Sequence, residues 1–183
     1  VEMTAAILQA AGIKAVDCGN VGDTVIDAVD RDDAYEVLVL ELSSFQLHWA
    51  RQAHFEAAAI LNIADDHLDW HGSFDAYADA KFSILDRAEI AILNADDAPI
   101  VTRANRFTGR KVFFSLDTPA PGEIGVVEEL LVDRAFVADP QQASMICELA
   151  DIVPTVPHNV SNALAAAALA RAINVPHEAI QKA

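Results

Sequence analysis

Cysteine is scarce in this sequence, and long apolar runs are missing. Cys18 and Cys147 are the only cysteines among 183 residues, and they lie far apart without Cys-x-x-Cys spacing. Two such thiols fit a reducing cytoplasmic protein better than a disulfide-stabilised secreted one. No stretch approaches the roughly 20 apolar residues of a membrane-spanning helix, and no basic-then-apolar leader is found. We therefore expect a soluble cytoplasmic protein.

Positive charge is also in short supply. Twelve Lys and Arg residues face 28 Asp and Glu residues, which gives a formal net charge of −16. A surface that binds nucleic acid needs basic side chains against the phosphates, so this balance argues against that class of protein. An anionic ligand must instead be met locally, by metal ions, helix N-termini or a few basic side chains.

Short apolar runs alternate with helical segments along most of the chain. The runs at 37–40, 57–63 and 90–93 are too short for helices and too continuous for half-exposed strands, as is typical of strands buried on both faces. Parallel neighbours need crossover helices, so the alternation predicts an α/β fold with a doubly wound, mostly parallel sheet flanked by helices. Further strands are expected at 13–18 and 111–115, and helices at 2–11, 23–29, 74–87, 98–105, 157–173 and from 176 onward.

The region 119–151 has a different character. Its short apolar runs, 124–127, 130–133 and 135–137, are separated by charged pairs, which predicts a small antiparallel meander. We find no catalytic constellation there. With 53% hydrophobic residues, the chain can bury one core, to which this region would be a small appendage.

Candidate functional residues follow two of the predicted strands. Glu41 stands at the end of the 37–40 run, and open α/β sheets carry their chemistry beyond the carboxyl ends of the strands. A carboxylate followed by the hydroxyls of Ser43 and Ser44 could hold a metal ion or orient a phosphate. An ion pair with a nearby cation explains Glu41 equally well. Asn20 lies in a glycine-bracketed loop, 19–22, where the backbone could approach a ligand, although most such loops are only turns.

A denser polar cluster follows the 57–63 run. Its members lie within ten residues: Asn62, Asp65, Asp66, His67, Asp69 and His71. The spacing resembles part of a metallohydrolase site, but no second His-rich segment supplies the remaining zinc ligands. Lys81 lies beside the apolar stripe of the next predicted helix, where an ordinary surface lysine is the alternative.

Two asparagines open the last long helix. Asn159 and Asn162 are spaced i and i+3, so they face the same way in its first turn, where two amides could read the edge of a base. Helix capping alone explains Asn159 but not Asn162.

Five segments in this order resemble the Mur ligases, namely 41–46, 61–69, 80–81, 94–97 and 158–166. Sister ligases share the histidine, lysine and asparagine motifs, whereas the Ser-Ser-Phe-Gln segment most resembles the branch that adds D-glutamate to UDP-N-acetylmuramoyl-L-alanine. The resemblance implies that residues 1–183 form a P-loop-NTPase-like central domain. It also implies an ATP-dependent, ADP-forming amide ligase of cytoplasmic peptidoglycan synthesis.

The resemblance assigns roles to individual residues. It implies that a carboxylate takes the γ-phosphoryl group of ATP and that the amine of D-glutamate attacks the resulting acyl phosphate. Glu41 and His67 match the family's Mg²⁺ ligands, and Lys81 matches the lysine that the family carries as a carbamate, a further oxygen ligand. These three residues are the catalytic candidates.

The remaining matches concern substrate and nucleotide. Asn20 and Ser43 correspond to positions that line the phosphate and muramoyl-alanine end of the site. Asn159 and Asn162 correspond to those that hold adenine. ATP and Mg²⁺ are therefore the expected cofactors.

The sequence departs from the family pattern in two ways. The family's phosphate-binding loop should precede the first helix, yet no GxxxxGK[ST] motif occurs. Val156-Pro157 also stands before His158, where glycine is common in relatives. We expect the 183 residues to be a piece of a longer, monomeric ligase that lacks its uridine-binding and D-glutamate-binding domains. We expect this piece to be inactive alone and prone to self-association. A nucleotide- or Mg²⁺-binding module without turnover, or another ligase of the superfamily, are the alternatives.

Overall fold

The computed structural model describes residues 1–50, 52–64, 66 and 68–183. Within them, six strands form a sheet in chain order, with β3 to β6 parallel and β6, β7 and β8 antiparallel. The strands of this main sheet are β3 (Phe55–Ile60), β4 (Ala88–Asn94), β5 (Arg110–Phe114), β6 (Ile124–Val127), β7 (Leu130–Asp133) and β8 (Ser144–Glu148). A second, two-stranded parallel sheet pairs β1 (Ala15–Gly19) with β2 (Val37–Glu41).

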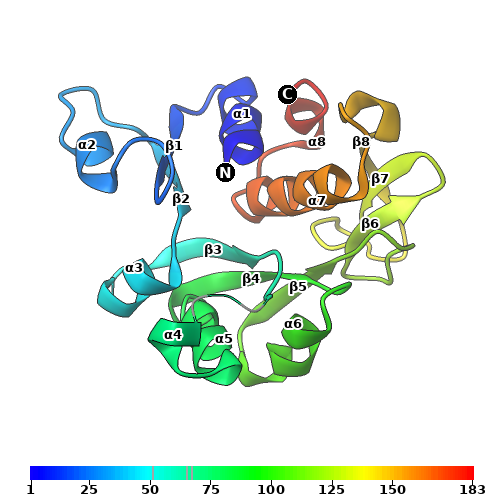
Figure 1. Cartoon of the computed structure of the whole chain (residues 1–183). Coiled ribbons are helices and arrows are strands. Elements are labelled where there is room, and N and C mark those ends of the chain that lie inside the picture. Colours follow the sequence, from blue (N-terminus) through cyan, green and yellow to red (C-terminus); the bar gives the residue numbers. More distant parts are fainter. Residues whose placement is uncertain (51, 65, 67) are drawn as a thin grey trace.

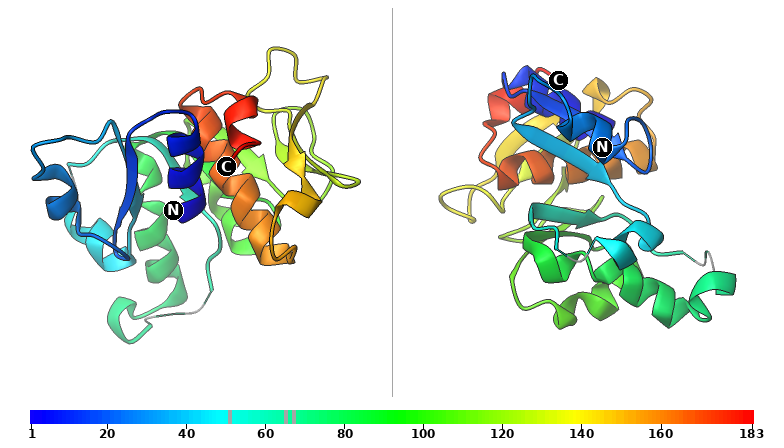
Figure 2. Two further views of the ribbon diagram at one scale, coloured as in Figure 1. Left: turned by 90° about the horizontal axis from the view of Figure 1, so that it is seen from above. Right: turned by 90° about the vertical axis from the view of Figure 1, so that its left-hand side faces the viewer.

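Helices cover both faces of the main sheet (Figure 1; right-hand view of Figure 2). One face carries α1 (Glu2–Ala10), α7 (Pro157–Ala172) and α8 (His177–Ile180), together with both termini. The other face carries α4 (Leu68–His71), α5 (Phe74–Phe82) and α6 (Ala98–Arg103). The short helix α2 (Val25–Val29) packs on β1, whereas α3 (Ser44–Trp49) follows β2 and packs on α5. Among the described residues, 3-10 turns span Leu85–Arg87, Ala104–Arg106 and Leu149–Asp151.

The core divides into two layers because successive strand side chains point to opposite faces. In β4, Ile92 belongs to the layer under α1 and α7, whereas Ala91 and Leu93 belong to the layer over α5 and α6, and all three are fully buried. Helix α7 is rich in alanine and buries Leu164 together with a run of small residues. Small side chains let it lie close to both the sheet and α1.

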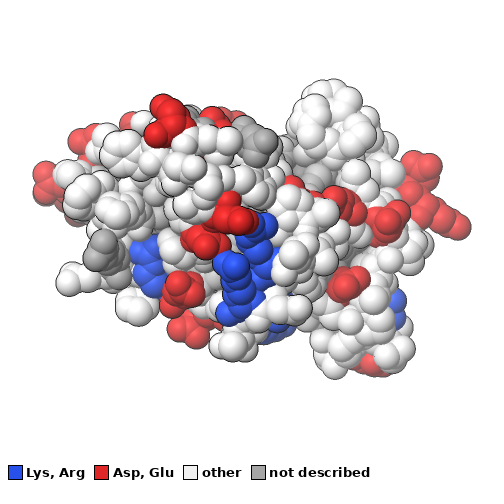
Figure 3. All heavy atoms as spheres, turned by 60° about the horizontal axis from the view of Figure 1, so that its bottom comes forward, with Lys and Arg blue, Asp and Glu red and all other residues white. Residues whose placement is uncertain are grey.

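Ion pairs link the helices on the α5 and α6 face of the sheet. Arg103 pairs with Asp75 and Arg106 pairs with Asp79, so α6 and the turn after it are linked to α5. The space-filling view of this side shows basic side chains set among acidic ones (Figure 3). These two arginines thus pair with the protein's own carboxylates.

The predicted fold class is confirmed, because the sheet is mostly parallel with helices on both faces. The predicted strand at 37–40 was wrong in its environment. The observed strand, β2, pairs with β1 outside the main sheet, and only Val39 of its five residues is buried. Its one strand neighbour among the described residues is β1, so the continuous apolar run did not mark a central strand.

The expected third strand of the meander was placed wrongly. It is β8, at Ser144–Glu148, and not 135–137. Residues 135 and 136 instead turn on the carboxylate of Asp133, which accepts hydrogen bonds from their backbone N–H groups at 2.8 Å each. The antiparallel strands continue the main sheet through β6, which pairs with β5.

No helix among the described residues is long and apolar enough to cross a lipid bilayer.

Candidate functional site

Glu41 and Asn20 are brought together by the register of the β1–β2 pair. Gly19 lies opposite Glu41, and the backbone N–H of Asn20 donates to the carbonyl oxygen of Glu41 at 2.8 Å. The side-chain Nδ2 of Asn20 also donates to Oε1 of Glu41, at 3.3 Å. The structure therefore joins two residues that are 21 positions apart in the sequence. The partner seen for Glu41 is an amide rather than the cation of the alternative interpretation.

Gly19 makes this approach possible. Its φ angle is +122°, and a Cβ atom built there would lie 2.4 Å from the carbonyl oxygen of Glu41. The 19–22 loop then closes on itself, because the Gly19 N–H donates to the carbonyl of Asp23 at 2.9 Å. The loop is thus a tight turn and also the support that holds Asn20 beside Glu41.

Ser43 is the N-cap of α3, a helix that was not predicted from the sequence, where a loop was expected after the strand. The Ser43 hydroxyl accepts from the backbone N–H of Gln46, and the Gln46 side chain accepts from the Ser43 N–H at 2.9 Å. This reciprocal capping box starts α3. The signal was present in the sequence as Ser-x-x-Gln.

Two side chains at the end of β4 tie the loops after β3 and β4 together. Asn94 Nδ2 donates to the carbonyl of Leu61 at 2.9 Å. Asp97 caps α6 through the N–H of Ile100 and also accepts from the N–H of Ile63 at 3.1 Å. The polar residues after β4 therefore fix the backbone at this edge of the sheet. These structural roles were not predicted from the sequence.

Lys81 lies on α5, half-buried, with its Nζ 5.5 Å from the centroid of the Tyr77 ring. Tyr77 is 5% exposed, so the cation rests on a buried aromatic face. His67 and Asp65, both members of the predicted polar cluster, lie outside the described residues. The position of Lys81 relative to a metal ion stays a prediction.

Asn159 and Asn162 lie in the first two turns of α7. The side chain of Asn159 donates to the carbonyl of Pro154 at 3.1 Å, and Asn162 is exposed. Asn159 thus helps to hold the loop that enters the helix, but the capping prediction was wrong, because the N-cap is Val156 and no side chain caps the helix. No described residue makes a side-chain hydrogen bond with Asn162, so its exposed amide is available for a ligand.

The donor set around Glu41 suits a hard cation. Mg²⁺ prefers oxygen ligands, which carboxylates and amide carbonyls supply. Glu41 is half-buried, and only one of its two carboxylate oxygens accepts a hydrogen bond from another described residue. The described residues therefore supply one carboxylate ligand that suits such an ion, and His67, the second predicted ligand, lies outside them.

A zinc-type site finds no support in the part of the chain that is described. No group of three His, Cys, Asp or Glu side chains there could hold a metal ion. Asp66, Asp69 and His71 are described members of the predicted cluster, and His71 is engaged elsewhere, at 3.0 Å from the hydroxyl of Ser44.

A hollow of about 590 Å³ lies between α3, α4 and α5. Its lining includes Ser44, His48, His71 and Arg87, but neither Glu41 nor Lys81. It is therefore adjacent to the candidate site rather than part of it.

The two cysteines are structural. Cys18, next to Gly19, is fully buried, and burial, followed by the negative charges of Asp17 and Asp23, raises the pKa of its thiol. Burial and then the charge of Asp151 raise the pKa of Cys147 to about 11. Both thiols therefore stay protonated at neutral pH, which makes them poor nucleophiles and poor metal ligands.

Comparisons with known proteins agree on one family. The family described as "Mur ligase middle domain" matches residues 4–170. A curated relative from Thermobifida fusca (strain YX), "UDP-N-acetylmuramoylalanine--D-glutamate ligase", is 50% identical over 187 residues. A relative of the same name from Streptomyces avermitilis is 49% identical. Each alignment covers 99% of this chain and 40% of the relative, so the chain spans about 40% of the length of these relatives.

Solved structures show the same fold at lower identity. A "UDP-N-acetylmuramoyl-L-alanyl-D-glutamate--2, 6-diaminopimelate ligase" has a TM-score of 0.73 and 19% identity, covering 99% of this chain and 42% of that one. The MurF ligase of Thermotoga maritima in complex with ADP has a TM-score of 0.62 and 16% identity, covering 100% of this chain and 45% of that one.

Proposed function

Because the chain belongs to the Mur ligase middle-domain family, we propose that it is the central, nucleotide-binding part of a ligase that joins D-glutamate to UDP-N-acetylmuramoyl-L-alanine. The observation that carries this proposal is the roughly 50% identity over nearly the whole chain to relatives of that name. The Ser-Ser-Phe-Gln segment at 43–46, which supplies the cap of α3, supports the same branch.

The reaction we propose has two steps. The muramoyl-alanine carboxylate attacks the γ-phosphorus of ATP, and ADP leaves. The amine of D-glutamate then attacks the acyl phosphate, phosphate leaves with the bonding electrons, and the ammonium proton passes to solvent or a nearby base. Activation is necessary because a carboxylate is a poor electrophile until one of its oxygens becomes a good leaving group.

The residues of this chain act mainly by holding and orienting. We assign Glu41, His67 and the carbamate of Lys81 to magnesium, and Asn20 and Ser43 to the phosphate and muramoyl-alanine end. Magnesium, when bound, neutralises charge that develops on the phosphoryl oxygens. The hydrogen bond from Asn20 supports this assignment, since it orients the carboxylate of Glu41 before any cation arrives.

We assign Asn159 and Asn162 to the adenine ring of ATP. Their support is their common face at the start of α7 and the exposure of Asn162. ADP in the related MurF structure is consistent with a nucleotide in this fold. We further propose that the complete protein is a cytoplasmic monomer and that the 183 residues alone do not turn over.

A substrate-omission assay of the complete gene product tests the proposal. ADP release should require Mg²⁺, UDP-N-acetylmuramoyl-L-alanine and D-glutamate together, and a new amide product should appear in equal amount. ADP release that ignores either substrate would contradict it. A strong preference for another amino acid would indicate a sister ligase of the superfamily.

The alternative, a binding module without turnover, has its own test. Calorimetry of these 183 residues with ATP and Mg²⁺ would favour it if the dissociation constant lay below about 1 μM, an affinity near −8 kcal/mol. Weak binding, together with activity of the complete protein, would leave the ligase assignment in place.

A further inference from the structure

His71, the last residue of α4, contacts two other helices. Its Nε2 lies 3.0 Å from Oγ of Ser44 on α3. Its ring stacks on Phe45 of α3 with centroids 5.8 Å apart, and it lies tilted against Tyr77 of α5 at 5.3 Å. Ser44 and Tyr77 are both buried, at 3% and 5% exposure. The half-buried imidazole therefore lies between α3 and α5, at the edge of the hollow described above.

Each of these contacts leads to a residue assigned to the site. Ser44 follows Ser43, the cap of α3, and lies three positions after Glu41. Tyr77 carries the Nζ of Lys81 over its ring. His71 thus connects the segment that bears Glu41 to the aromatic face on which Lys81 rests.

The backbone does not supply this connection. Among the described residues, β2 is hydrogen-bonded to β1 in a sheet separate from the main one. Glu41 therefore has no strand ladder to fix its distance from α5. The packing of α3 on α5 must do so, and His71 lies at that contact.

We propose that His71 is a positioning residue that sets the separation between Glu41 and Lys81. The inference rests on the proposed function, because it concerns the same cation site. Ser44 is its partner on one side and Tyr77 is its partner on the other. Residues that orient metal ligands from outside the coordination shell typically change affinity or activity 10- to 100-fold when they are lost.

The test compares four variants of the complete gene product. His71→Ala removes both links, Ser44→Ala removes only the hydrogen bond, and His71→Gln keeps a polar group at the reach of Nε2. His54→Ala is the matched control, because His54 is exposed at the start of β3. Three quantities are measured for each: kcat, the KM for ATP, and the dissociation constant of Mn²⁺, a paramagnetic substitute for Mg²⁺, by electron paramagnetic resonance.

We expect His71→Ala to weaken Mn²⁺ binding and lower kcat, each by roughly 10- to 100-fold. The KM for ATP should stay within about twofold, since α7, which carries Asn159 and Asn162, lies on the opposite face of the sheet from α4. Ser44→Ala should shift the same two quantities less, His71→Gln should recover part of the loss, and His54→Ala should change neither.

Two outcomes would overturn the inference while leaving the ligase intact. One is unchanged Mn²⁺ affinity and kcat in His71→Ala. The other is an equal loss of kcat and Mn²⁺ affinity in His71→Ala and His71→Gln that is explained by the fraction of unfolded protein, as measured by thermal melting. That result would mean a purely structural role for His71. Wild-type protein without Mg²⁺-dependent ADP release would overturn the proposed function itself and this inference with it.

Discussion

Gly19 lies where strands β1 and β2 come too close for a side chain. Its φ of +122° belongs to the region that glycine alone adopts readily, and the Glu41 carbonyl occupies the space that a Cβ would need. The sequence marked the 19–22 loop and Glu41 as separate candidates. Their proximity depends on the β1–β2 register, which no pattern in either segment specifies.

Replacement of Gly19 by alanine should therefore cost more than an ordinary glycine change. We expect Gly19→Ala to lower the free energy of unfolding by about 3 kcal/mol or more, from backbone strain together with steric overlap. Gly12→Ala is the control, because its φ is also positive, at +81°, but no atom lies within 4 Å of the added Cβ. That change should cost about 1 to 2 kcal/mol. Equal losses in urea denaturation would refute the close approach.

The raised pKa of the Cys147 thiol predicts how its alkylation rate depends on pH. The pKa of Cys147 rises from 9.0 to about 11, so at pH 8 its thiolate fraction falls roughly 100-fold. The native chain should reach half its maximal alkylation rate near pH 11, and the urea-unfolded chain near pH 9. Since unfolding lowers this pKa, the thiol's contribution to stability is complete below pH 9 and is lost as the pH rises to about 11. Native alkylation with a midpoint near pH 9 would contradict the burial of Cys147.

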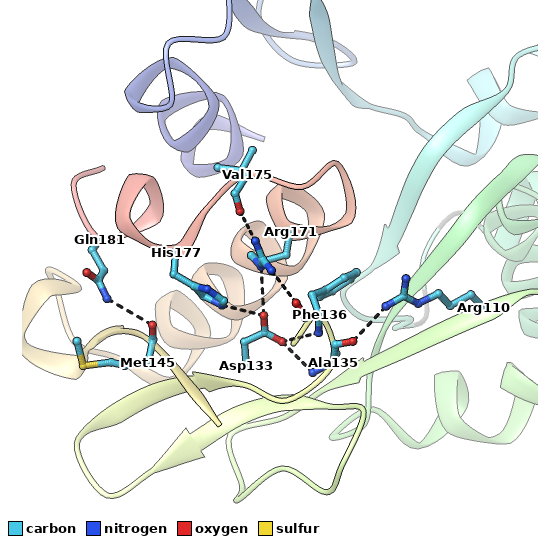
Figure 4. A network of polar contacts seen from close by, with 9 residues as sticks. All are labelled: Arg110, Asp133, Ala135, Phe136, Met145, Arg171, Val175, His177 and Gln181. Carbon is cyan, nitrogen blue, oxygen red and sulfur yellow. Dashed lines mark hydrogen bonds and ion pairs between the residues drawn. The ribbon is translucent and has the colours of Figure 1, made fainter. Parts of the chain in front are cut away.

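At the scale of elements, a buried carboxylate ties β7 to α7 and α8 (Figure 4). Asp133 is fully buried, and its Oδ2 accepts from Arg171 Nε at 3.2 Å and contacts His177 Nε2 at 2.9 Å. Arg171 also donates to the carbonyls of Phe136 and Val175, at 2.6 Å each. Both oxygens of Asp133 and all three guanidinium nitrogens of Arg171 therefore have hydrogen-bond partners, which is the condition for a charged group to be tolerated inside a protein.

Removal of this carboxylate should leave Arg171 as an uncompensated buried charge. We expect Asp133→Ala to lower the free energy of unfolding by about 3 to 5 kcal/mol. The control is Asp33→Ala, whose side chain is 93% exposed and pairs with Lys14 at the surface. That substitution should change stability by less than about 1 kcal/mol. The network would have little importance if both variants unfolded at the same urea concentration.

The helices and strands themselves were largely predictable. The sequence pattern predicted β3, β4 and β5 within a few residues, and the helix expected at 2–11 is α1. Helix α3 was missed because its apolar residues continue the preceding strand, so the period was ambiguous. The capping box of Ser43 and Gln46 was the better signal.

At the scale of the whole molecule, the sequence predicted a layered α/β fold but not the division of its strands into two sheets. Periodicity reports which faces are buried and not which strands pair, so β2 was expected in the main sheet rather than beside β1. The candidate residues came from the family motifs, and their mutual geometry depends on long-range packing. Of them, Asn20 and Glu41 are the pair that the structure joins directly.

The account as a whole depends on Lys81 belonging to the same site as Glu41. The most direct measurement is the rate of ADP formation by the complete gene product carrying Lys81→Ala, with Lys182→Ala as control, since Lys182 is exposed near the end of the chain. We expect the Lys81 variant to lose at least about 100-fold in rate and to regain part of it with short-chain carboxylates, which replace the missing oxygen ligand. The control should keep full activity. Unchanged turnover in Lys81→Ala would remove this lysine from the site and contradict the account.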